Sequence, residues 1–212
     1  MALILGFFDL LAYAIPGALY LSTFAYMAHR AGWIDIPSVL QAPSLLLLIT
    51  LTVAAFLVGQ AATPLGGLVD RLNPFGSRSV PDRAKEEFLR RNAGAAPRRF
   101  LQLDPYTLLA AIEERDKEAA TDVVRLRSTA AMLSRAAPAL VLAAVVAVVE
   151  AFTGPLPLFA VLTGVVLAVV AIGCLVQSVA FRRWVVIRTY ELCFWDDDLD
   201  GRIPGRSGPD EP

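Results

Sequence analysis

Four acidic side chains form the densest group in the chain that could do metal chemistry: Glu113, Glu114, Asp116 and Glu118. Carboxylate oxygens are the ligands that hard divalent cations prefer. Arg115 and Lys117 alternate with these acids, however, and mixed charges at helical spacing are typical of a solvated helix face. We therefore expect no metal site here and no cofactor.

Histidine and cysteine are too scarce for most enzyme chemistry. His29 is the one histidine, which excludes a histidine metal cluster and most general-base schemes at neutral pH. Phosphate-binding loops, dinucleotide fingerprints and C-x-x-C pairs are absent from the sequence. We expect Cys174 and Cys193 to be free thiols, because two cysteines are too few for a disulfide framework. The sequence thus favours a protein that is not an enzyme.

Asp9 and Glu150 are the ionisable residues that border or enter apolar segments. A charge in hydrocarbon is costly, so such residues are candidates for a proton relay or an ion pathway. The topology argued below puts Asp9 near the cytoplasmic membrane face and Glu150 near the outer face, beside His29 and Arg30. Because the two acids lie on opposite sides, we favour interfacial residues that each pair with a nearby cation.

The chain that carries these residues is far more apolar than a soluble domain. Hydrophobic residues make up 56% of its 212 residues, and its mean hydropathy is +0.57. A helix needs roughly 20 apolar residues to cross a bilayer. Four segments qualify, which predicts an all-α, polytopic membrane protein with four transmembrane helices arranged as two hairpins. The predicted spans are residues 8–28 and 44–63 in hairpin 1–69, and residues 136–152 and 157–181 in hairpin 136–181.

Lysine and arginine predict the orientation of these spans. Thirteen of the 19 basic residues fall between Asp70 and Arg135, five follow from Arg182 on, one is Arg30, and the turn at Gly154 has none. Basic residues near span ends favour the cytoplasm, so both termini are expected there, in a bacterial inner membrane. The first apolar segment lacks a basic region before it, so we expect an uncleaved helix. The remaining parts would be a cytoplasmic helical region 70–135, a juxtamembrane helix 182–195 and a disordered acidic tail 196–212.

Asp104 and Pro105 form a strong helix start, and no breaker follows until Pro138. One long amphipathic helix over 105–135 is therefore predicted. Its apolar positions follow a heptad pattern that includes Asp116; the main members of this assembly seam are Leu109, Ile112, Val123, Leu126 and Leu133. The seam could join copies of the chain as a coiled coil, or it could pack inside its own subunit. We favour packing within the subunit, because the pattern is short and alanine occupies two of its positions.

Small residues recur at four-residue spacing in the third and fourth spans. Such residues let helix backbones approach closely in lipid, so we predict helix packing through Ala139, Ala143, Ala147, Ala160, Gly164 and Ala168. Pro16 and Gly17 could bend the first span. Aromatic residues after the fourth span, from Trp184 to Trp195, would either anchor a helix at the membrane interface or cover the long helix.

These features favour a non-enzymatic bacterial inner-membrane protein whose cytoplasmic helices mediate assembly or sense a signal. Membrane-perturbing effectors of toxin or antiphage systems share this general build. A small transporter or channel is the first alternative, and an intramembrane enzyme is the least favoured. The expected partners are the lipid bilayer, further copies of the chain in a homo-oligomer, and a cytoplasmic protein or small signal molecule. Nucleic acid is not expected, since 19 basic and 20 acidic residues nearly cancel.

Overall fold

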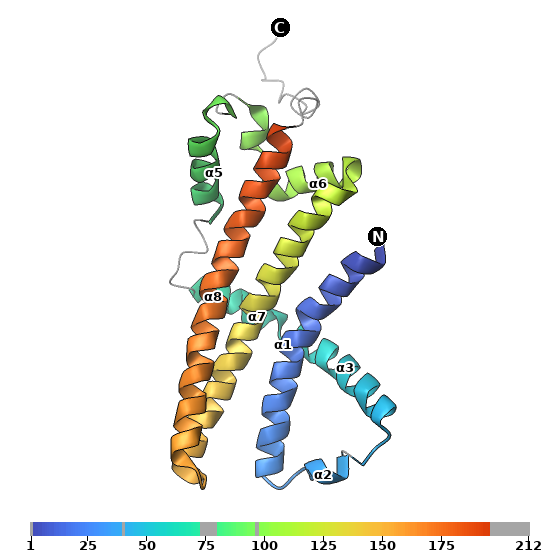
Figure 1. Cartoon of the computed structure of the whole chain (residues 1–212), viewed down its shortest axis with the longest axis vertical. Helices are drawn as coiled ribbons and strands as arrows, with labels where there is room; N and C mark the ends of the chain where they lie inside the picture. The colour runs from blue at the N-terminus through green and yellow to red at the C-terminus, as the bar shows by residue number, and fades with distance from the viewer. Residues whose placement is uncertain (1, 40, 73–79, 96–97, 196–212) are drawn as a thin grey trace. The chain divides into compact units, whose positions relative to one another are not determined.

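The computed structural model describes residues 2–39, 41–72, 80–95 and 98–195, and in these ranges it consists of helices and short turns without a strand (Figure 1). Side chains are described for the same residues except 2–9, 36, 69–72, 99 and 115. The predicted acidic tail and the connector at 73–79 lie outside the described residues. The all-α prediction is confirmed.

Four helices in the described ranges are long and apolar enough to cross a membrane. They are α1 (Ala2–Arg30), α3 (Ser44–Ala61), α7 (Lys117–Thr153) and α8 (Pro157–Phe194). Shorter helices connect them: α2 (Ile36–Val39), α4 (Thr63–Leu72), α5 (Val80–Arg91) and α6 (Pro105–Arg115), with single turns of 3-10 helix at Ala93–Ala95 and Arg99–Gln102.

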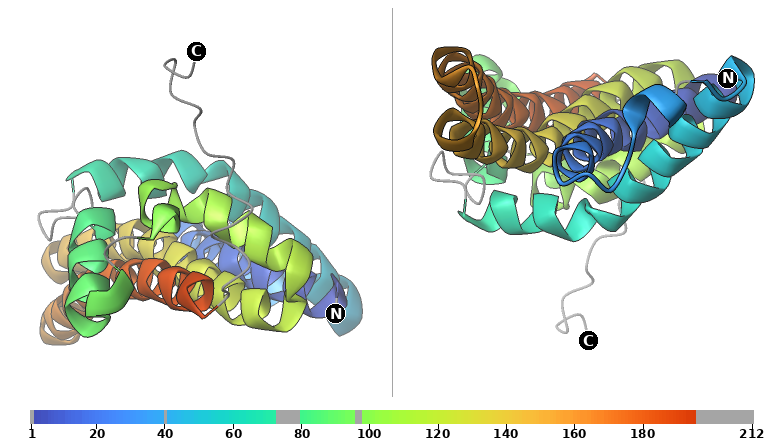
Figure 2. Two further views of the ribbon diagram at one scale, coloured as in Figure 1. Left: turned by 90° about the horizontal axis from the view of Figure 1, so that it is seen from above. Right: turned by 90° about the horizontal axis from the view of Figure 1, so that it is seen from below.

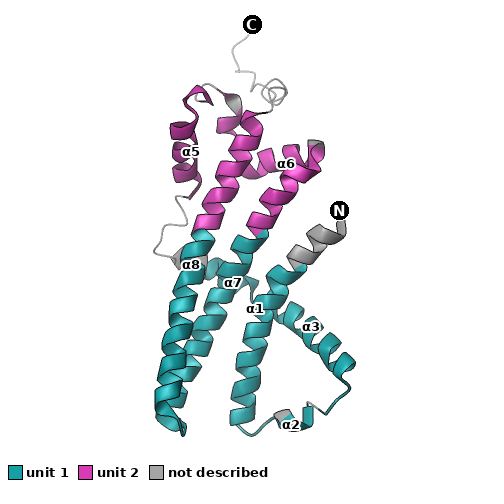
Figure 3. Ribbon diagram, viewed as in Figure 1, with its two compact units in different colours: residues 1–77, 128–179 teal, residues 78–127, 180–212 magenta. Residues whose placement is uncertain are grey.

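The chain divides into two compact units, coloured separately in Figure 3. Unit 1 comprises Met1–Ser77 and Ser128–Val179, and unit 2 comprises Arg78–Arg127 and Ala180–Pro212. The first unit therefore holds α1, α3 and the apolar parts of α7 and α8. The second holds α5, α6, the polar start of α7 and the end of α8. Both long helices contribute residues to both units without a break.

The predicted helix over 105–135 is wrong as one continuous element, because it breaks at Asp116. Asp116 has φ −130° and ψ 92°, which lies outside the helical region. Its carboxylate accepts hydrogen bonds from the backbone N–H groups of Glu118 and Ala119, both at 3.0 Å. Aspartate favours such caps over helix interiors, so the acid in the heptad pattern ends α6 and begins α7. The start of α6 is as predicted, since Asp104 caps it and Pro105 follows.

Helix boundaries elsewhere follow from local signals. α1 ends where Gly32 adopts φ +74°, a left-handed conformation that suits glycine. After Ala62 the chain continues as a further helix, since Thr63–Leu72 forms α4. Pro64 does not prevent this helix, because a proline in the first turn removes no intrahelical hydrogen bond. α8 continues through the predicted juxtamembrane segment to Phe194 as a single helix.

Aromatic rings from three elements fill the core of unit 2. Phe88 of α5 is fully buried and contacts Phe100, Tyr190 and Phe194, with ring centroids 5.6 to 6.4 Å apart. Tyr190 and Phe194 come from the end of α8, so this helix supplies one wall of the core. Trp195, by contrast, is 80% exposed. Tyr190 and Phe194 therefore cover α5, whereas anchoring of this segment at a membrane interface stays a prediction.

The heptad seam is largely buried inside unit 2. Leu109 and Val123 form a cluster with Val185 of α8, and Ile112 belongs to the aromatic core. Leu126 packs against the edge of the first cluster. Leu133 lies further along α7, in unit 1, and is half-buried. These contacts fit packing within the subunit, because side chains that are already buried present little surface to a second copy.

Candidate functional site

In unit 1, α1 and α3 cross with their backbones in contact, and this crossing can be followed in Figures 1 and 2. Glycine at both crossing points lets the backbones touch. A Cβ atom on Gly17 would lie 1.7 Å from the carbonyl oxygen of Ala55, and one on Gly59 would lie 2.0 Å from that of Tyr13. No side chain can occupy that space, so these two glycines hold α1 and α3 together. Pro16, next to Gly17, is fully buried.

Two arginine contacts join α1 to α7. The Arg135 guanidinium lies 4.1 Å from the centre of the Tyr13 ring and donates a hydrogen bond of 3.3 Å to its hydroxyl group. Arg30 forms a salt bridge of 3.2 Å with Glu150. At 1.5 Å per residue, the two contacts lie about 25 Å apart along α1 and about 22 Å apart along α7. Because the earlier residue of α1 contacts the earlier residue of α7, and the later one the later one, α1 and α7 run in the same direction.

Glu150 is held by Arg30 of α1. The Arg30 Nε donates to the carboxylate, and a second guanidinium nitrogen donates to the carbonyl oxygen of Thr153 at 3.3 Å. The side chains of Arg30 and Glu150 are 51% and 20% exposed, as suits a pair at the end of a span. His29 lies beside this pair in the sequence and bonds the Ile34 carbonyl oxygen. The side chain of Asp9, the other predicted ionisable residue, lies outside the described residues.

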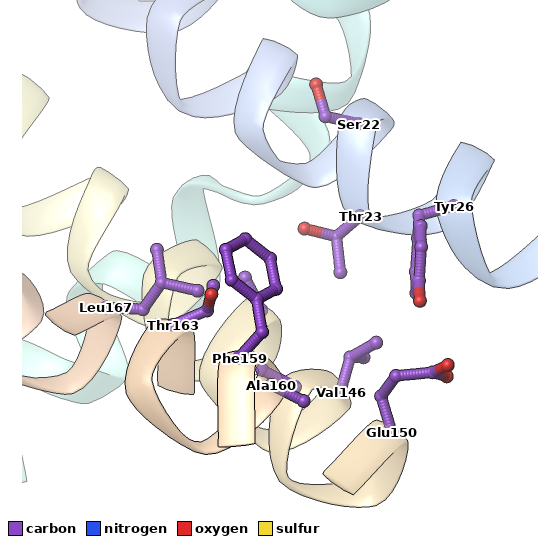
Figure 4. Close-up of a pocket in the computed structure, with 11 residues that line it drawn as sticks. Ser22, Thr23, Tyr26, Val146, Glu150, Phe159, Ala160, Thr163 and Leu167 are labelled. Atoms are coloured by element: carbon purple, nitrogen blue, oxygen red, sulfur yellow. The ribbon is translucent and has the colours of Figure 1, made fainter. Parts of the chain in front are cut away.

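Between these contacts, α1, α7 and α8 leave a groove of about 320 Å³ (Figure 4). Its lining residues are Ser22, Thr23, Tyr26, Ala143, Val146, Ala147, Glu150, Phe159, Ala160, Thr163 and Leu167. Ser22 and Thr23 donate their hydroxyl hydrogens to the α1 carbonyl oxygens of Ala18 and Leu19. The groove is therefore mainly apolar, and Glu150 and Tyr26 give it one polar end.

The predicted small-residue stripes are only partly used within the chain. Ala139, Ala160 and Gly164 are buried in unit 1, and Ala143 and Ala147 line the groove. Ala168 is exposed, whereas Ala171 is 1% exposed. A strict four-residue step drifts around a helix of 3.6 residues per turn. After Gly164 the buried face therefore continues at a seven-residue step, and Ala168 turns away from it.

Charged residues tie α5 to α8 in unit 2. The Glu87 carboxylate pairs with Arg91 on its own helix and with Arg183 on α8. The Arg91 guanidinium also lies 5.5 Å from the centre of the Trp184 ring. Lys85 donates a hydrogen bond of 2.8 Å to the Leu101 carbonyl oxygen. These contacts lie beside the aromatic core and fix the end of α8 in unit 2.

The acidic group at the junction of α6 and α7 is not assembled as a metal site. Glu113, Glu114 and Glu118 are exposed, while Asp116 uses its carboxylate as a helix cap. Among the described residues, no three histidine, cysteine or acidic side chains converge as a metal site would require. Both cysteines are free thiols.

No protein-family model, curated protein or solved structure matches the chain. The features that sequence reasoning missed are the Gly17–Gly59 crossing, the Tyr13–Arg135 contact and the groove. Gly17 lies next to Pro16 and was read as part of a bend, and nothing in the spacing of Gly59 marks it as its partner. The strongest candidate sites are thus the groove of unit 1 and the α5–α8 contact region of unit 2.

Proposed function

We propose that the chain is a non-enzymatic, multi-pass protein of the bacterial inner membrane. Unit 1 lies in the bilayer as two hairpins, α1 with α3 and α7 with α8, and unit 2 lies in the cytoplasm with both termini. Unit 2 receives a cytoplasmic partner or a small signal molecule. Unit 1 responds by altering the permeability of the membrane.

The continuity of α7 and α8 carries this proposal. α7 has 37 residues, among them Pro138, and α8 has 38, and each passes from one unit into the other without a break in the helix. A continuous helix transmits a displacement or rotation along its length, because its hydrogen bonds resist local bending. Any ligand that moves the start of α7 against the end of α8 would therefore act on the apolar halves of both helices.

Sensing is a better-supported role for unit 2 than assembly through the seam. Leu109, Ile112 and Val123 are 6% exposed or less and contact their own chain. Releasing them for a coiled coil between copies would cost the burial that they already have. Any homo-oligomer would therefore form through other surfaces.

Two independent features support the topology of unit 1, the first its orientation and the second its number of crossings. Arginine and lysine are concentrated in the segments that flank Arg135 and Arg182, which favours the cytoplasm for that side. The parallel course of α1 and α7, fixed by their two arginine contacts, requires an odd number of membrane crossings between the end of α1 and the start of α7, and α3 supplies one.

Thiol labelling of intact cells tests the topology. In a chain with Cys174→Ser and Cys193→Ser, we expect Ser38→Cys to react with a membrane-impermeant maleimide in intact cells. Glu114→Cys, exposed on unit 2, should react only after the membrane is opened. The two positions are both exposed, so each controls for the reactivity of the other. Labelling of Glu114→Cys in intact cells would contradict the proposed orientation.

Breaking the helical link tests whether unit 2 acts on unit 1. We expect the native chain to depolarise a bacterial host on induced expression. Insertion of two glycines between Arg127 and Ser128 should reduce the depolarisation at least fivefold, the lower end of measured allosteric couplings. The insertion lies at the unit boundary within α7, so it leaves the residues of each unit unchanged. Membrane potential would be measured with a voltage-sensitive dye at matched amounts of inserted protein.

The matched control carries the same two glycines between Pro155 and Leu156, in the turn before α8. It should depolarise like the native chain, because this turn transmits no helical displacement. Equal depolarisation by both insertions would overturn the coupling. A native chain that inserts well without changing the potential would overturn the permeability response.

A further inference from the structure

The groove of unit 1 is framed by the contacts between α1 and α7. At one end Tyr20 of α1 packs in a cluster with Ala139 of α7, and at the other Arg30 pairs with Glu150. All α1 and α7 lining residues fall between these two contacts in the sequence. α8 closes the third side with Phe159, Ala160, Thr163 and Leu167. Between these two contacts α1 and α7 do not pack directly against each other, which leaves the groove open.

The chemistry of the lining changes from one end of the groove to the other. Alanine, valine, leucine and phenylalanine side chains form most of the wall. Tyr26 and Glu150 lie together at one end, as Figure 4 shows. Arg30 lies beside Glu150 with a half-exposed side chain, and its two hydrogen bonds use two of its five N–H groups. An apolar groove whose polar end, at Tyr26 and Glu150, lies beside the half-exposed Arg30 guanidinium matches the two parts of a phospholipid, its acyl chain and its headgroup.

The surroundings of the groove also favour lipid as its occupant. Phe159 is 68% exposed, and Leu162 and Val165 on the same helix are also exposed. In the orientation proposed above these side chains face hydrocarbon, so the neighbouring groove opens on acyl chains. Water is a poor alternative, because an apolar cavity offers it few hydrogen-bond partners.

The size of the groove argues against a helix of a second copy. A helix is about 10 Å across with its side chains, so a 10 Å length of it occupies roughly 800 Å³. The groove has about 320 Å³. A single hydrocarbon chain can lie along a groove of this volume, whereas a helix of a second copy could enter it only with its side chains.

We propose that this groove is a lipid-binding site that takes one acyl chain of a membrane phospholipid, whose phosphate is bound by Arg30. The proposal rests on the membrane insertion of unit 1 proposed above. The topology places Arg30 and Glu150 at the outer face, so the bound phospholipid belongs to the outer leaflet. It would fill the gap between α1 and α7 and stabilise their spacing.

Native mass spectrometry of the full chain tests this site. The protein would be reconstituted in vesicles of phosphatidylglycerol and phosphatidylethanolamine, extracted in mild detergent and released in the gas phase. We expect one retained phospholipid per native chain. Ala143→Phe adds a ring to a half-buried lining position and should lower the occupancy at least tenfold. Val165→Phe adds the same bulk outside the groove, at a side chain that is 54% exposed, and should retain the lipid.

Two further variants keep the test decisive. Ala143→Leu fills less of the groove and should lower the occupancy by a smaller factor, which covers the case that the phenylalanine variant does not fold. Arg30→Gln removes the phosphate contact together with the salt bridge to Glu150 and should weaken retention. Equal retention by native chain, Ala143→Phe and Arg30→Gln would overturn the site. So would a dimer without lipid, which would show that a second copy covers the groove.

Extraction of membranes at alkaline pH distinguishes a failure of the lipid site from a failure of the proposed membrane insertion. A chain that stays in the membrane pellet but retains no phospholipid overturns the lipid site alone. A chain that is released into the soluble fraction overturns membrane insertion, and with it both proposals.

Discussion

Replacement of Gly17 or Gly59 by alanine is expected to separate α1 from α3. Each added Cβ would lie 2.0 Å or less from a backbone carbonyl oxygen of the other helix, a distance that backbone atoms cannot relieve by a change of rotamer. Overpacking of this kind typically costs about 1 to 3 kcal/mol, and we expect the upper end for each variant because the contact is with backbone. Unfolding titration with dodecyl sulfate in mixed micelles would measure the loss.

Two other glycines of unit 1 provide matched controls for this prediction. A Cβ on Gly173 would meet nothing within 4 Å, and one on Gly164 would lie in ordinary contact at 3.5 Å from Ala144 and Ala147. Gly173→Ala and Gly164→Ala should therefore unfold at the native concentration of dodecyl sulfate or above it, since alanine favours a helix by up to about 1 kcal/mol. Equal destabilisation by all four substitutions would show that glycine acts here through helix propensity and not through the crossing.

This crossing illustrates what the sequence could not predict. Run length and hydrophobicity identify apolar helices, because the thickness of a bilayer sets their length. They do not identify which faces meet, because all faces of α3 are apolar and burial from water no longer selects one of them. Gly59 stands between Val58 and Gln60 with no feature that pairs it with Gly17. Only the position of the backbones reveals the contact.

The positions of charged residues predicted more of the contacts between helices than the apolar pattern did. Glu150 and Arg30 border short turns that the topology puts on the same membrane face, and an acid at a span end needs a cation. The structure places them 3.2 Å apart. The contact of Arg135 with Tyr13 was not predictable in the same way, because an aromatic ring that accepts a cation looks like any other apolar residue in a sequence pattern.

The break at Asp116 shows where periodicity misleads. A heptad pattern counts spacing and tolerates one polar position, whereas the backbone responds to the local competition for hydrogen bonds. Asp116 could cap a new helix because the N–H groups of Glu118 and Ala119 were within its reach. With the break, Leu109 and Ile112 belong to a separate helix from Val123, and all three pack inside unit 2.

Phe88→Ala is expected to unfold unit 2 while unit 1 stays in the membrane. The ring is fully buried and contacts three other aromatic rings from two further segments of the chain. Truncation of a buried phenylalanine typically costs about 3 to 5 kcal/mol, which is a large share of the stability that a unit of this size has. Limited proteolysis of inverted membrane vesicles should cleave within residues 80–127 much faster than in the native chain, while α1 and α3 remain protected.

Tyr106→Ala is the matched control, because it also removes an aromatic ring from unit 2. Tyr106 is 57% exposed and its ring contacts the Arg127 guanidinium at 5.0 Å, a contact worth about 0.5 to 1 kcal/mol at an exposed site. Proteolysis should cleave the Tyr106→Ala chain at a rate near the native one. The cleavage rate of Phe88→Leu should fall between those of the two alanine variants. Under the proposed coupling, Phe88→Ala should also lose depolarisation, since an unfolded unit 2 cannot act on α7 and α8. Rapid cleavage with full depolarisation would mean that the membrane helices act without unit 2.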